Sequence, residues 1–97
     1  TEVKKIAAFA ETYDMFVQPH HCAGPISTAV SVQLDACITN FIIQEWRPFA
    51  HAALYDLVEE ALDLQAFDGR FTVPDTPGLG VVLNEDVIGQ YPHVHIE

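Results

Sequence analysis

The stretch that decides the fold is MFVQPHHCAGPISTAVSVQLDACITNFIIQEW, residues 15–46. It begins with a short apolar run at 15–18 and closes with a second one at 41–46. Between them, residues 26–39 place apolar side chains at helical spacing, and Pro25 stands directly before the first turn. Strands that are apolar throughout are typical of a parallel sheet covered by helices, and this length suits one βαβ unit. The sequence therefore predicts an α/β fold.

The flanking segments carry weaker signals. Residues 1–14 have the periodicity of an amphipathic helix, and residues 51–62 could form another. Asp68-Gly69 stands between two apolar-rich arms, which indicates a short hairpin. Asn84 can cap a short helix after an irregular loop that is rich in proline and glycine. No internal repeat or linker divides the chain, so we expect one small unit.

Composition narrows the range of partners. The chain has 97 residues, 49% of them hydrophobic, and a formal net charge of −10 with only four Lys and Arg residues. Such an acidic surface repels phosphates, so we expect neither nucleic acid nor an anionic membrane as a partner. The two cysteines are too few for a disulfide scaffold, which favours reduced thiols and a cytoplasmic protein. Cys37 falls on an apolar helical stripe and is predicted to lie in the core.

Two polar residues stand where the predicted strands end. His20 comes just after the first strand, which we expect to end at Pro19, and Glu45 lies near the end of the second. The carboxyl ends of neighbouring parallel strands meet at one edge, where α/β proteins bind ligands. Both side chains can therefore face one pocket. The ordinary alternative is a solvated histidine and a carboxylate held in an ion pair.

Alternation within residues 41–46 predicts two faces for the second strand. One face would carry Phe41, Ile43 and Glu45, and the other would carry Ile42, Gln44 and Trp46. Packing of Trp46 against the helix layer is the simpler interpretation, and a place in the substrate pocket is the alternative.

His21 and Cys22 directly follow His20 and could suggest a metal site or a nucleophilic cysteine. Adjacent residues rarely reach the same ion, and zinc sites usually use spaced pairs of ligands. Neither interpretation is favoured.

PHHCAGPISTAVSVQLDACITNFIIQEW (19–46) and DGRFTVPDTPGLGV (68–81) together resemble a known family. The patterns PHxxxGPI, NFxIQE and DGxxxxPxxPGLGV occur in this order in the C-terminal part of the mandelate racemase and muconate lactonizing branch of the enolase superfamily. The resemblance extends over residues 1–91 and is greatest to the sugar-acid dehydratases of the galactonate dehydratase type. It implies an α/β fold of a particular kind, the last part of a modified TIM-like (β/α)7β barrel.

On this resemblance, residues 15–18 and 41–46 would be barrel strands seven and eight. Residues 1–73 would belong to the catalytic barrel, and residues 74–97 would form an irregular tail that returns toward a capping domain. A TIM-like barrel needs about 200 residues or more, so we expect the rest of the enzyme upstream of Thr1. The resemblance also allows the segment after the second strand to be irregular rather than helical.

The resemblance implies a function as well. His20, four residues before GPI, would be the catalytic acid or base, and Glu45 would stabilise the enediolate formed from a small-molecule sugar acid. Trp46 is a weaker candidate for binding that acid. The family's Mg²⁺ would have its ligands upstream, with none in this chain, and the other partners would be the remaining part of the same enzyme in a homo-oligomer. A racemase or cycloisomerase of the same superfamily, or a non-catalytic structural fragment, is the alternative.

Overall fold

The structure is a computed structural model, and it describes residues 1–47, 52–94 and 96. Residues 48–51, which include the start of the predicted helix at 51–62, and residues 95 and 97 of the predicted tail lie outside the described part. Along the chain the elements are α1 (Glu2–Glu11), β1 (His20–His21), α2 (Pro25–Asp35), β2 (Glu45–Trp46), the 3-10 helices η1 (Ala52–Leu57) and η2 (Leu62–Gln65), and α3 (Glu85–Ile88). No described helix is long and apolar enough to cross a membrane.

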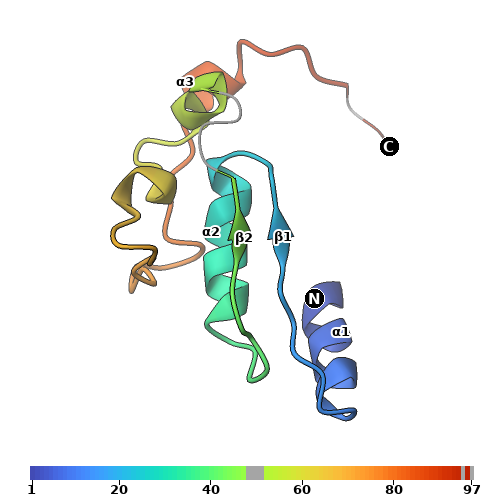
Figure 1. The fold of residues 1–97 in the computed structure, drawn as a ribbon. Coiled ribbons are helices and arrows are strands. Elements are labelled where there is room, and N and C mark those ends of the chain that lie inside the picture. Colours follow the sequence, from blue (N-terminus) through green and yellow to red (C-terminus); the bar gives the residue numbers. More distant parts are fainter. Residues whose placement is uncertain (48–51, 95, 97) are drawn as a thin grey trace.

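β1 and β2 form a two-stranded parallel sheet in which His20 is the Cα partner of Glu45 and His21 that of Trp46. α2 connects the two strands and lies along one face of them (Figure 1). This is the βαβ arrangement that the apolar runs predicted, so the α/β class and the parallel pairing are confirmed.

α2 begins where its sequence favours a helix start. Gly24 is the extended N-cap, and Pro25, whose missing N–H costs nothing there, occupies the first helical position. The helix ends at Asp35 rather than at residue 39, because the N–H of Cys37 bonds to the carbonyl of Leu34 in a tighter turn. Cys37 thereby leaves the apolar stripe and is exposed, so the prediction that it lies in the core was wrong.

The strands are shorter and differently placed than predicted. Of residues 15–18 and 41–44, only Val17 and Phe41 form a bridge, and regular pairing resumes at His20 and Glu45, beyond Pro19. The prediction that the first strand ends at Pro19 was therefore wrong. From this bridge to the paired strands, the chain advances three residues on one side, from Val17 to His20. On the other side it advances four, from Phe41 to Glu45.

The extra residue between Phe41 and Glu45 makes the second strand a β-bulge opposite a proline that cannot donate a ladder hydrogen bond. A bulge interrupts the alternation of side chains. The single alternation predicted for residues 41–46, with Phe41 and Glu45 on one face, is therefore wrong.

Asn40 connects α1 to the residues that precede β1 through hydrogen bonds. Its buried side-chain Nδ2 donates to the carbonyl of Ala7 at 3.0 Å and to that of Met15 at 2.9 Å. Its own carbonyl accepts the N–H of Val17 at 2.9 Å. The side-chain N–H groups and the backbone carbonyl of Asn40 thus have hydrogen-bond partners, as buried polar groups require.

The described residues of the segment predicted to be helical, 52–62, do not form an α-helix. Ala52–Leu57 forms the 3-10 helix η1, and the chain then turns into an antiparallel bridge between Val58 and Leu83. The carbonyl of Leu57 accepts the N–H of Asn84, so this pairing stops the helix from continuing. The helical prediction for residues 51–62 was therefore wrong, as far as the described residues extend.

Two local predictions from the C-terminal half are confirmed. Phe67 and Arg70 exchange backbone hydrogen bonds around Asp68 and Gly69, which have φ values of 50° and 69°, as a tight hairpin turn requires. The side chain of Asn84 accepts the N–H of Val87 and caps α3.

Candidate active site

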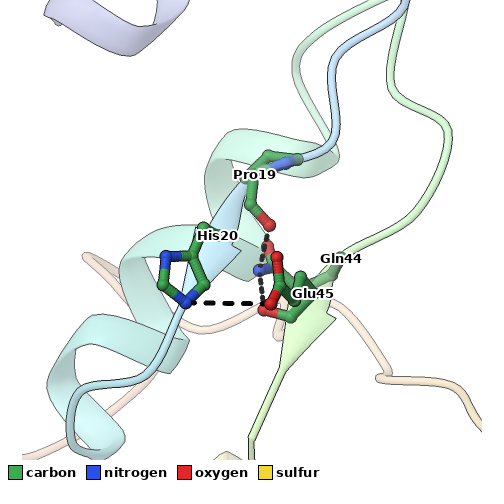
Figure 2. A network of polar contacts seen from close by, with 4 residues as sticks. All are labelled: Pro19, His20, Gln44 and Glu45. Carbon is green, nitrogen blue, oxygen red and sulfur yellow. Dashed lines mark hydrogen bonds and ion pairs between the residues drawn. The ribbon is translucent and has the colours of Figure 1, made fainter.

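His20 and Glu45 meet on the two strands, as Figure 2 shows. The imidazole Nε2 lies 3.8 Å from the carboxylate Oε1, and the side chains are 63% and 59% exposed. The separation is too long for a hydrogen bond but suits an ion pair when the imidazole is protonated. A solvated pair of this kind adds little to stability, so its two functional groups are free to contact a ligand. The predicted proximity of these two side chains is confirmed, although His20 lies within β1 and not beyond it. That both face one ligand pocket stays a prediction.

The backbone beside this pair is held by Gln44, which the sequence analysis did not single out. Its Nε2 donates to the carbonyls of Pro19 and of Glu45, each at 2.8 Å (Figure 2). The carbonyl of Pro19 also accepts the N–H of Glu45 at 3.0 Å. Gln44 thus adds a side-chain hydrogen bond between the bulged strand and the strand that carries His20. A glutamine directly before a strand-end carboxylate was the only signal in the sequence.

Trp46 is held by contacts away from the pair. Its indole N–H donates to Asp63 Oδ1 at 3.0 Å, and its ring meets Phe71 edge-on with the centroids 5.0 Å apart. These contacts give it the packing role that was the simpler interpretation, although its partners come from η2 and the segment after the hairpin. A role for Trp46 in substrate binding stays a prediction.

A groove of about 510 Å³ runs between α2, β2 and the hairpin turn. Neither His20 nor Glu45 lines it, whereas consecutive residues of the bulge do, among them Ile43 and Gln44. Asp35 lines it as well, with a buried Oδ1 that has no hydrogen-bond partner among the described residues. Burial raises the pKa of this carboxyl from 3.8 to about 6.

We expect Asp35→Asn to stabilise the full-length protein at neutral pH. The unfolded carboxyl ionises near its usual pKa of 3.8 and the folded one only near 6, so stability falls as the pH rises through that window. The variant, which lacks this titration, should have a higher Tm than the parent at pH 7, and the difference should vanish below pH 4. Thermal unfolding across this range measures the effect. The exposed Asp56→Asn is the matched control, and a lower Tm for Asp35→Asn at pH 7 would contradict the prediction.

The described residues do not fit a Mg²⁺ site by themselves. They contain no group of three or more His, Cys, Asp or Glu side chains close enough to hold an ion. The imidazole of His21 is turned into the interior, where its Nε2 lies 3.2 Å from Thr28 Oγ1, whereas the free thiol of Cys22 is exposed. These neighbours therefore do not form a joint site.

Comparison with known proteins agrees with this architecture. Residues 1–87 match the family described as enolase C-terminal domain-like. The chain is 40% identical over 92 residues to a D-galactonate dehydratase from Pectobacterium atrosepticum. A crystal structure from Mesorhizobium loti superposes with a TM-score of 0.81 at 36% identity and covers 96% of this chain. An enolase of the mandelate racemase subgroup from Agrobacterium tumefaciens gives a TM-score of 0.72 at 35% identity over 88% of this chain.

The matches extend over most of this chain but only part of each relative. The aligned region is 24% of the Pectobacterium dehydratase, 25% of the Mesorhizobium chain and 23% of the Agrobacterium chain. The chain thus spans about a quarter of the length of the relatives it matches. A family match over residues 1–87, together with a shared fold, leaves one assignment: this chain belongs to the enolase C-terminal domain-like family of the enolase superfamily.

Proposed function

We propose that these residues are the C-terminal part of a sugar-acid dehydratase. Residues 1–73 complete its catalytic barrel with strands seven and eight, and residues 74–97 return toward a capping domain. The observation that carries the proposal is the convergence of His20 and Glu45, 3.8 Å apart on paired parallel strands. The similarity to D-galactonate dehydratases supports the reaction class.

Dehydration of an aldonic acid breaks two bonds. The C–H bond next to the carboxylate breaks, its proton passes to a base, and the electron pair is delocalised into an enediolate. The neighbouring C–O bond then breaks, and the departing hydroxyl takes a proton and leaves as water. The resulting enol becomes a 2-keto-3-deoxy acid.

The described residues fit two of these tasks. The imidazole of His20 can transfer a proton as acid or base at neutral pH, which suits removal of the α-proton, departure of the hydroxyl, or both. Glu45 lies beside it at a distance where both groups can contact one substrate. In its protonated form the carboxyl of Glu45 would donate a hydrogen bond to the substrate carboxylate as negative charge develops there.

The remaining parts of the proposal lie outside the described residues. We place the three carboxylate ligands of Mg²⁺ in the upstream part of the enzyme. That the enzyme is a homo-oligomer stays a prediction. Its cytoplasmic location also stays a prediction, and the two free cysteines support it. A racemase or cycloisomerase would use the same pair and is distinguished by its product.

The test is turnover by the full-length protein. We expect it to convert at least one aldonic acid from a stereochemically complete panel, with Mg²⁺ present, into a 2-keto-3-deoxy acid. Exchange of the α-proton with deuterated solvent, without loss of water, would instead indicate a racemase. No turnover and no exchange with any acid would leave the non-catalytic alternative.

We expect Glu45→Ala to lower kcat by about 10²-fold, because this is the usual effect of removing one group that stabilises a developing oxyanion. Steady-state kinetics on the best acid of the panel measures the loss. Glu60→Ala makes the same change at an exposed carboxylate elsewhere and should leave kcat unaltered. Equal rates for the two variants would remove Glu45 from the mechanism.

A further inference from the structure

A buried polar network lies behind the His20–Glu45 pair. It consists of His21, Thr28, Asp63 and Trp46, of which the first three are at most 4% exposed. Thr28 Oγ1 donates to Asp63 Oδ1 at 2.8 Å, and the indole N–H of Trp46 donates to the same oxygen at 3.0 Å. His21 Nε2 lies 3.2 Å from Thr28 Oγ1. One carboxylate oxygen therefore links segments that are far apart in the sequence.

The directions of these bonds determine the tautomer of His21. The hydroxyl of Thr28 has a single hydrogen, which it donates to Asp63. In the bond between Thr28 and His21, the imidazole must then be the donor, so Nε2 carries the proton. In a neutral ring the opposite nitrogen, Nδ1, is then an acceptor, and it is buried with no partner among the described residues. The ring can therefore donate only toward Thr28, which gives it one orientation.

The network reaches both strands next to the proposed catalytic groups. His21 follows His20 in β1, and Trp46 follows Glu45 in β2. Successive side chains of a strand point to opposite faces, so holding one residue inward determines the direction of its neighbour. Thr28 comes from α2 and contacts His21, whereas Asp63 comes from η2 and contacts Trp46.

We propose that Thr28 and Asp63 are positioning residues for the His20–Glu45 pair, an inference that rests on the proposed function. Each named strand has only two residues, and a bulge precedes β2, so the backbone pairing alone defines these strand ends poorly. Asp63 supplies the missing constraint, directly through Trp46 and indirectly through Thr28 and His21. Catalytic groups must be held to within about 0.5 Å, and such precision requires supporting hydrogen bonds.

The first experiment compares two substitutions of Thr28 in the full-length protein. Thr28→Val keeps the shape and removes the hydroxyl, whereas Thr28→Ser keeps the hydroxyl. We expect Thr28→Val to lower kcat by about tenfold with KM changed less than about twofold, because a displacement of 1 Å can cost up to 10²-fold in rate. Thr28→Ser, which keeps the hydroxyl, should have a kcat within about twofold of the parent value. A Thr28→Val protein with a lower Tm but the parental kcat would overturn the proposal.

The second experiment does not depend on turnover, so it separates this inference from the proposed function. Crystal structures of the full-length parent and of Thr28→Val give the separation of His20 Nε2 from Glu45 Oε1 in each. A difference of more than about 0.5 Å supports positioning, and an unchanged separation overturns it. If Thr28→Val does not fold, Trp46→Phe, which keeps an aromatic ring but removes the other hydrogen bond to Asp63, is read in the same way, by the position of Glu45.

Discussion

Replacing His20 by asparagine in the full-length protein is expected to lower kcat for dehydration by about 10³-fold. Asparagine keeps a polar side chain of similar size but cannot exchange a proton near neutral pH, and general acid–base groups contribute about 10²–10⁴-fold. KM should change far less than kcat, because the imidazole is needed for proton transfer and not chiefly for binding. Steady-state kinetics at saturating Mg²⁺ provides both numbers.

The control for this prediction is His93→Asn, the same substitution at an exposed position in the tail. It should leave kcat at the parental value. If His20→Asn retained full turnover, the imidazole would have no part in the reaction, and the proximity of His20 and Glu45 would reflect only their strand register. The Asp63 network would then hold two residues that have no shared task.

The second large effect concerns the 97-residue chain expressed alone, which we expect not to fold cooperatively. Its accessible surface is 7385 Å², whereas a compact monomer of its mass of 10.8 kDa would expose about 5,500 Å². Its radius of gyration is 14.9 Å, against about 12.5 Å for a compact chain of this length. Figure 1 shows the same open arrangement, with the two strands forming a sheet that has no further strand among the described residues.

The large exposed apolar surface explains why the isolated chain should not fold cooperatively. Large side chains that a core would bury are exposed, among them Phe9, Phe16, Ile42 and Ile43. The buried apolar residues are mostly small, and neither edge of the parallel pair has a further strand among the described residues. A calorimetric scan of the isolated chain should show no unfolding peak, and dyes that bind exposed apolar surface should bind it strongly. A cooperative transition with a defined midpoint, like that expected for the full-length protein, would contradict the prediction.

Much of the architecture was predictable because it depends on local patterns. Apolar runs of strand length on either side of a helical stripe predicted the parallel βαβ unit. Asp68-Gly69 and Asn84 predicted a hairpin turn and a helix cap, since both depend on the conformations of a few consecutive residues. Even the meeting of His20 and Glu45 followed from the rule that parallel strands end at one edge of the sheet.

The errors occurred where the outcome depends on distant residues. η1 stops because residues near Val58 pair with residues near Leu83, and nothing in the local sequence indicates that partner. The core position predicted for Cys37 failed because α2 closes in a tighter turn after Asp35. Helical spacing alone does not determine where a helix ends.

The sequence by itself thus determined the fold class, the parallel strands and the imidazole and carboxylate that they carry, because hydrophobic periodicity and strand direction are properties of short segments. Only the tertiary structure decided the one-residue bulge opposite Pro19 and the convergence of His21, Thr28 and Trp46 on Asp63. Strand register and buried hydrogen bonds join residues that are distant in sequence, and each depends on donors and acceptors brought together only when the chain has folded.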